Sequence, residues 1–127
     1  FLQCAPIEPK TIAAGIKVGI LTGPWPLNAL KESDGAAETV SDDEIVQAEK
    51  LMARNEALFA EPASAAPVAV LKKLLDKGKI RKDESNVCVI TGSGLKDIDA
   101  LDKYLGSPPI IKPDIRALKT LLEQPQG

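Results

Sequence analysis

The chain has 127 residues, of which 44% are hydrophobic and 27% charged, a balance typical of one globular domain rather than of a disordered segment. The net charge is −2 and the basic residues are scattered, which argues against a nucleic-acid surface. No apolar run approaches the ~20 residues that a membrane span requires. The chain has no histidine, which excludes Ser–His and Cys–His nucleophile pairs and removes the commonest zinc ligand. We therefore expect a soluble, cytoplasmic protein with a single α/β domain over residues 1–127 and no metal site.

The first third of the chain predicts loops and one short helix. Residues 1–10 contain prolines and no periodicity, as in an extended lead-in. Residues 11–19 are small and apolar with two glycines, which disfavours a helix and favours a close-packed turn against a ligand. Proline is favoured at the first helical position, so a short helix is expected from Pro26 to Ser33. A short strand is expected over residues 37–40.

Two helices are predicted in the middle of the chain. The first, over residues 42–57, begins with Ser41 and Glu44, which have the spacing of a capping box and precede apolar residues at helical intervals. After a short strand at 59–61, Ser64 is expected to cap the second helix. The buried stripe of this second helix is expected to comprise Val68, Leu71, Leu74 and Leu75.

The last third of the chain contains the best candidate for a buried strand. Residues 86–91 (Asn-Val-Cys-Val-Ile-Thr) form a continuous β-favouring run, which is typical of a strand covered on both faces. A short strand over residues 109–112 and a helix over residues 114–123 are expected downstream. Strand, helix, strand and glycine loop in succession indicate an α/β fold with parallel pairing. We therefore predict a three-layer open sheet, mostly parallel.

Two of the predicted strands end in small or hydroxyl residues. One leads into Glu-Pro-Ala-Ser at residues 61–64, and the other into Thr-Gly-Ser-Gly at residues 91–94. Ligands of open α/β sheets bind at the carboxyl ends of the strands, and successive backbone N–H groups in such turns form anion-binding nests. Taken alone, the glycine motif is compatible with both a ligand site and a plain turn.

The flanks of these two motifs favour the ligand site. Glu-Pro-Ala-Ser-Ala-Ala at residues 61–66, a helix, and residues 87–97 together resemble the C-terminal part of threonine synthase, a fold-type II enzyme that uses pyridoxal phosphate. The resemblance extends roughly from Pro9 to Asp97, and Thr-Gly-x-Gly-Leu-Lys-Asp at residues 91–97 is its most specific element. Residues 20–26 are more similar to the related dehydratases, which leaves the substrate open.

The resemblance implies a role for five residues at the cofactor. Thr91 matches the hydroxyl that hydrogen-bonds the pyridine nitrogen, and Gly92 lets the backbone approach the ring. Gly15 matches the position where the main chain passes the side of the ring that bears the phenolic oxygen. Glu61 and Ser64 match the strand end beneath the reacting carbon. No segment matches the family's Schiff-base lysine motif or its glycine–asparagine phosphate loop, which are expected upstream, so no catalytic residue is assigned.

The resemblance also implies an activity for the parent enzyme. A threonine synthase converts an amino-acid substrate, O-phosphohomoserine, into threonine and phosphate, and we expect a homodimer without nucleic-acid or membrane partners. The isolated fragment is expected to be inactive. Two alternatives remain: another fold-type II lyase or synthase, such as a cysteate synthase or a threonine dehydratase-like enzyme, and a non-catalytic ligand-binding or regulatory α/β module.

Overall fold

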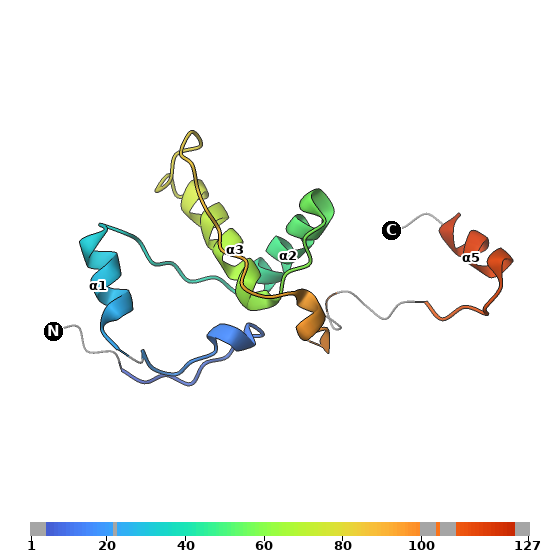
Figure 1. The fold of residues 1–127 in the computed structure, drawn as a ribbon, viewed down its shortest axis with the longest axis horizontal. Helices are drawn as coiled ribbons and strands as arrows, with labels where there is room; N and C mark the ends of the chain where they lie inside the picture. The colour runs from blue at the N-terminus through green and yellow to red at the C-terminus, as the bar shows by residue number, and fades with distance from the viewer. Residues whose placement is uncertain (1–4, 22, 100–103, 105–108, 124–127) are drawn as a thin grey trace.

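A computed structural model describes residues 5–21, 23–99, 104 and 109–123. Helices α2 (Asp42–Glu56) and α3 (Pro62–Asp76) pack against each other at its centre. Helices α1 (Trp25–Glu32) and α5 (Ile115–Leu122) lie on opposite sides of this pair (Figure 1). None of the helices among these residues combines the length and the apolar composition of a membrane span.

The capping box of α2 is confirmed. The backbone N–H of Glu44 donates to Ser41 Oγ at 3.2 Å, and the backbone N–H of Ser41 donates to Glu44 Oε2 at 2.6 Å. Three acidic residues in the first turn also interact favourably with the helix dipole. The helix ends at Glu56, where Ala57 adopts a left-handed conformation with φ of 54°.

The predicted start of α3 is wrong by three residues. The helix begins at Pro62, and Glu61 is its N-cap residue, whose carbonyl accepts from the N–H groups of Ser64 and Ala65 at 2.9 and 3.0 Å. Proline fits the first helical position because its φ is already helical and it has no N–H to satisfy. The Ser64 side chain is thereby released from capping.

The predicted apolar stripe of α3 is wrong as well. Its larger aliphatic residues are only half-buried, and the buried positions carry mostly small residues: Pro62, Ser64, Ala65, Ala66 and Ala69. Small side chains let the two helix backbones approach closely. In the core, the alanines of α3 pack with Ile45, Ala48 and Met52 of α2, together with Ala13 and Ala60. The core is aliphatic, as expected, but richer in alanine.

The described residues contain none of the predicted strands. Residues 37–40, 86–91 and 109–112 are irregular, and Val87 in the second of these segments is 91% exposed. Residues 59–61 contribute only an isolated antiparallel bridge between Ala60 and Ser93. A strand requires backbone partners, and the residues around 86–91 supply none. The expected parallel pairing is therefore not found in this part of the chain, and the three-layer sheet stays a prediction.

The remaining elements are short. The turn expected at residues 11–19 contains a 3-10 turn, η1 (Ala14–Ile16), and a second one, η2 (Gly94–Lys96), follows the glycine motif. The helix predicted from Pro26 is α1, which begins one residue earlier. The helix predicted over residues 114–123 is α5, whose N-cap Asp114 accepts from the Arg116 N–H at 3.0 Å. Helix positions are thus predicted well where local capping determines them.

Candidate functional site

The five predicted site residues lie together around the first turn of α3. Glu61 and Ser64 belong to that turn, and the 91–92 segment is hydrogen-bonded to both of them. Gly15 belongs to η1, which packs against α3. Segments separated by more than 70 residues in the chain therefore meet at one point.

Ser64 connects α3 to the glycine motif. Its Oγ accepts from the backbone N–H of Thr91 at 3.0 Å and from that of Gly92 at 2.7 Å. It also lies 2.9 Å from Thr91 Oγ1. The Ser64 side chain is fully buried, whereas Thr91 is exposed. Ser64 therefore holds the segment in place from beneath, and Thr91 lies on the exposed side of this contact.

Glu61 fixes the same segment from its other side. Its backbone N–H donates to the carbonyl of Gly92 at 3.1 Å, and its carboxylate forms an ion pair with Lys96 at 3.1 Å. A Cβ added at Gly92 would overlap the Glu61 carboxyl group. A side chain at position 92 would therefore displace the Glu61 carboxylate from its present position. The pairing with Lys96 leaves no unbalanced negative charge on Glu61.

Gly15 lies close to the same carboxylate. A Cβ at this position would lie 3.1 Å from Ala63 Cβ and 3.9 Å from Glu61 Oε1. The preceding residues are anchored on α2, because Asp42 Oδ1 accepts from Thr11 Oγ1 at 2.7 Å and from the Ile12 N–H at 3.1 Å. Asp42, which from the sequence is only a helix-terminal residue, therefore helps to position η1.

The chemistry of this cluster suits a flat, uncharged ring with an acceptor atom. Thr91 offers a neutral hydroxyl, and the Glu61 carboxylate beside it is paired with Lys96. The described residues contain no group of His, Cys, Asp or Glu side chains suited to a metal ion. The cluster therefore fits the pyridine ring of pyridoxal phosphate better than it fits a cation.

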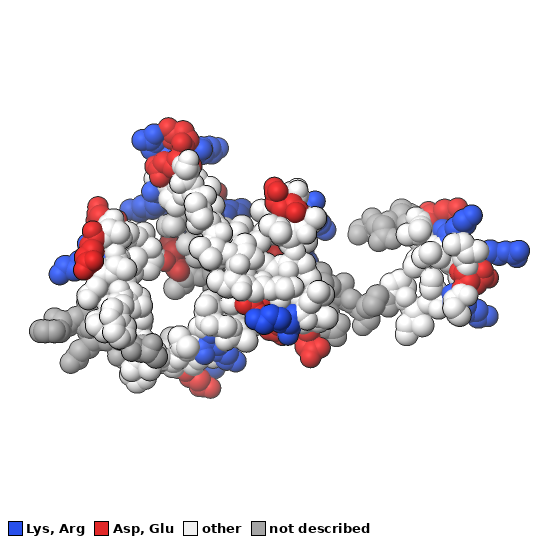
Figure 2. All heavy atoms as spheres, in the orientation of Figure 1, with Lys and Arg blue, Asp and Glu red and all other residues white. Residues whose placement is uncertain are grey.

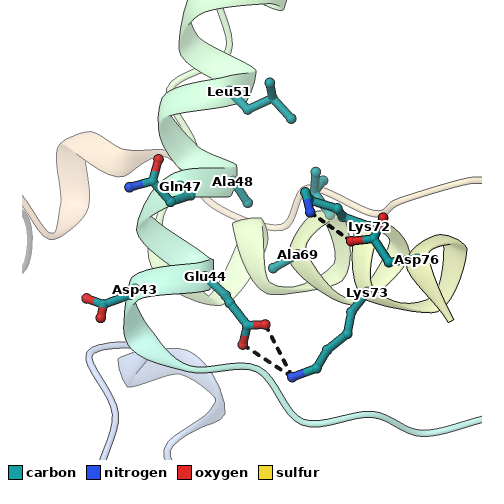
Figure 3. Close-up of a pocket in the computed structure, with 10 residues that line it drawn as sticks. Asp43, Glu44, Gln47, Ala48, Leu51, Ala69, Lys72, Lys73 and Asp76 are labelled. Carbon is teal, nitrogen blue, oxygen red and sulfur yellow. Dashed lines mark hydrogen bonds and ion pairs between the residues drawn. The ribbon is translucent and has the colours of Figure 1, made fainter.

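A separate groove of about 480 Å³ lies between α2 and α3 (Figure 3). Two ion pairs lie on its walls, Lys73–Glu44 at 3.2 Å and Lys72–Asp76 at 2.8 Å. None of its lining residues belongs to the predicted site.

On the face shown in Figure 2, acidic and basic side chains are mixed at the edges around a broad uncharged surface.

Glu49 is a buried acidic residue that the sequence reasoning missed. Its side chain is on the core side of α2, and among the described residues neither carboxylate oxygen has a hydrogen-bond partner. Burial, with a smaller contribution from the nearby negative charge of Asp97, raises the pKa of Glu49 to about 7. The sequence does contain a signal for this burial, because Glu49 has helical spacing from the apolar residues Ile45 and Met52.

In a comparison with known proteins, the chain is similar to several enzymes named threonine synthase. The chain is 48% identical over 118 residues to the threonine synthase of Methanocaldococcus jannaschii, covering 92% of this chain and 29% of that enzyme. It is 42% identical over 113 residues to the enzyme of Methanosarcina acetivorans, covering 88% of this chain and 28% of the relative. It is 40% identical over 108 residues to the threonine synthase of Halalkalibacterium halodurans, covering 84% of this chain and 30% of that enzyme.

These relatives confirm the resemblance to threonine synthase. The chain spans about three-tenths of their length. Residues 3–92, more than half of the chain, match the sequence pattern of the pyridoxal-phosphate dependent enzymes. The match confirms the expected cofactor and agrees with an α/β domain of fold type II. The chain belongs to the family of pyridoxal-phosphate dependent enzymes.

Proposed function

We propose that this chain forms the floor of the cofactor site in an enzyme that converts O-phosphohomoserine into threonine and phosphate. The observation that carries the proposal is the convergence of Gly15, Glu61, Ser64, Thr91 and Gly92 on one turn of α3. Relatives of 40–48% identity that are named threonine synthase support the choice of reaction. In this reaction the substrate loses its γ-phosphate and gains water at the β carbon.

Each residue has a proposed task at the cofactor. Pyridoxal phosphate, when bound, supplies a ring that withdraws electrons from the substrate carbons. The Thr91 hydroxyl hydrogen-bonds the pyridine nitrogen, and because it is neutral it does not hold that nitrogen protonated as a carboxylate would. Gly15 and Gly92 let the backbone lie close to the ring. Glu61 keeps the 92–94 loop in register through Gly92 and Lys96.

The three-layer open sheet belongs to this proposal. Residues 86–91 have a β-favouring composition, are irregular in the structure and are largely exposed. We place them as a strand of the complete enzyme, paired with parts of the protein outside this chain. We also propose that the 127-residue chain alone is inactive, because it spans only about three-tenths of its relatives and contains no match to the lysine motif.

The reaction is tested with the complete protein that carries this chain. Incubation with O-phosphohomoserine and pyridoxal phosphate should release phosphate and form threonine in equal amounts. Threonine and serine, offered as substrates of a dehydratase, should give much less 2-oxo acid. Release of 2-oxo acid from these substrates, with no phosphate released from O-phosphohomoserine, would replace the proposed reaction by that of a dehydratase.

The role of Thr91 is tested by two substitutions. Thr91→Val keeps the shape and removes the hydroxyl, so cofactor affinity should fall about fivefold, which corresponds to about 1 kcal/mol for one neutral hydrogen bond. Thr91→Ser keeps the hydroxyl and is the matched control, with affinity near that of the unmodified protein. Equal affinities for all three proteins would show that the Thr91 hydroxyl does not contact the ring.

A further inference from the structure

Three polar atoms of the 91–92 segment surround the buried Ser64 hydroxyl. The two backbone nitrogens, of Thr91 and Gly92, lie 3.0 and 2.7 Å from Ser64 Oγ, and Thr91 Oγ1 lies 2.9 Å from it. A serine hydroxyl carries one hydrogen and two lone pairs. Because backbone N–H groups can only donate, they occupy both lone pairs of Ser64 Oγ. Only its hydrogen remains for the third contact.

This count determines the direction of the contact between the two hydroxyls. Ser64 donates its hydrogen to Thr91 Oγ1, since Ser64 Oγ has no lone pair left with which to accept a third hydrogen. The Thr91 hydrogen is therefore not used toward Ser64, and among the described contacts no other protein acceptor takes it. A hydroxyl that accepts one hydrogen bond is also polarised into a stronger donor.

We propose that Ser64 is a positioning residue that makes the Thr91 hydroxyl a hydrogen-bond donor toward the bound ligand. The favoured ligand atom is then an acceptor, such as the unprotonated nitrogen of an aromatic heterocycle. This inference rests on the proposed role of Thr91 at the pyridine nitrogen and adds the direction of that bond. Ser64 acts through Thr91 and does not touch the ring, because its side chain is completely buried.

The test uses the complete protein loaded with pyridoxal phosphate that carries ¹⁵N in the ring. In the unmodified protein, the nitrogen signal should lie at the position of an unprotonated, hydrogen-bonded pyridine. Ser64→Ala should move the signal toward its position in Thr91→Val. In the Thr91→Val background, Ser64→Ala should cause no additional displacement, because the Thr91 hydroxyl through which Ser64 acts is already absent. Ser93→Ala is the matched control: among the described contacts, this exposed hydroxyl of the same loop accepts only from the Leu95 N–H, at 3.3 Å.

The outcomes separate this inference from the proposed function. A displaced signal in Thr91→Val with an unchanged signal in Ser64→Ala would refute the positioning role and leave the cofactor site in place. An unchanged signal in Thr91→Val would overturn the role of Thr91 itself. A protonated nitrogen in the unmodified protein would overturn the proposed direction of the bond.

Two further measurements each remove one dependence: Ser64→Cys does not need the alanine variant, and amide hydrogen exchange does not need the cofactor. Ser64→Cys preserves the shape and has a weaker donor, so it should displace the nitrogen signal in the same direction by a smaller amount. No displacement would refute the proposal. In the cofactor-free protein, Ser64→Ala should accelerate amide hydrogen exchange at Thr91 and Gly92, while Ser93→Ala should leave it unchanged. Unchanged exchange in Ser64→Ala would show that Ser64 does not accept these two N–H groups.

Discussion

Replacing Glu49 by glutamine is expected to remove a pH dependence of stability. The Glu49 carboxylate is 2% exposed and has no hydrogen-bond partner among the described residues, so its charged form is strongly disfavoured. Its pKa rises from an ordinary value of 4.5 to about 7 in the folded chain. Glutamine has nearly the same shape and stays neutral at every pH, so it isolates the cost of the charge.

The sign and size of the effect follow from proton linkage. Between pH 4.5 and about 7 the folded chain holds a proton on Glu49 that the unfolded chain has lost. The free energy of unfolding therefore decreases as the pH rises through this window, by about 1.4 kcal/mol per pH unit for a full proton. The total decrease in the free energy of unfolding is about 3 kcal/mol, and it is complete above the pKa of Glu49 in the folded chain.

The assay is urea denaturation of the 127-residue chain and its Glu49→Gln variant at about pH 4 and about pH 8. The quantity to compare is how the difference between the two proteins changes with pH, because Glu38 and Glu44, whose pKa values are lowered mainly by hydrogen bonds, affect both proteins alike. The chain has no histidine to titrate in this range. Glu49→Gln should gain about 3 kcal/mol relative to the unmodified chain between the two pH values.

The matched control is Glu56→Gln, which removes an exposed carboxylate at the end of the same helix. It should show little change with pH relative to the unmodified chain. If Glu49→Gln and Glu56→Gln respond alike, Glu49 is not desolvated in solution and the reasoning from its burial is refuted.

Three further predictions concern local structure, each read from the urea midpoint. Ser41→Ala removes the N-cap of α2 and should cost about 1 kcal/mol; an unchanged midpoint would mean that the capping box contributes nothing. Gly78 has φ of 64°, so Gly78→Ala should cost about 1 kcal/mol, and a stabilised variant would contradict this backbone conformation. In Gly94→Ala the new Cβ would lie 2.6 Å from Phe59 Cε2, so a loss of about 1–3 kcal/mol is expected; no loss would show that the ring moves freely.

Capping and periodicity signals in the sequence predicted the positions of the helices well, but they predicted the first residue of α3 wrongly. The start of α2 follows from Ser41 and Glu44, which are three residues apart and satisfy each other's backbone groups. At α3, two start signals compete within three residues: Pro62 suits the first helical position and Ser64 suits a cap. Pro62 prevails because the Ser64 hydroxyl instead accepts from the 91–92 segment, a partner 27 residues away that no local pattern reveals.

The site residues were found by resemblance, whereas their connections required the structure. The Thr-Gly-Ser-Gly motif alone is compatible with a plain turn. The contacts of Glu61 with Gly92 and Lys96 connect segments more than 30 residues apart, so nothing in the sequence pairs them. The strand prediction at residues 86–91 depended on composition, and composition supplies no hydrogen-bonding partner.

The exposed segment at residues 86–91 has a consequence for handling the isolated chain. Val87 and Val89 are 91% and 65% exposed, and among the described contacts no backbone–backbone hydrogen bond involves residues 86–90. The segment therefore presents an unpaired backbone edge beside apolar side chains. An edge of this kind is a template onto which another chain adds, which makes it a starting point for aggregation. The 127-residue chain should therefore self-associate increasingly with concentration, and a lysine at position 87 or 89 should delay the precipitation.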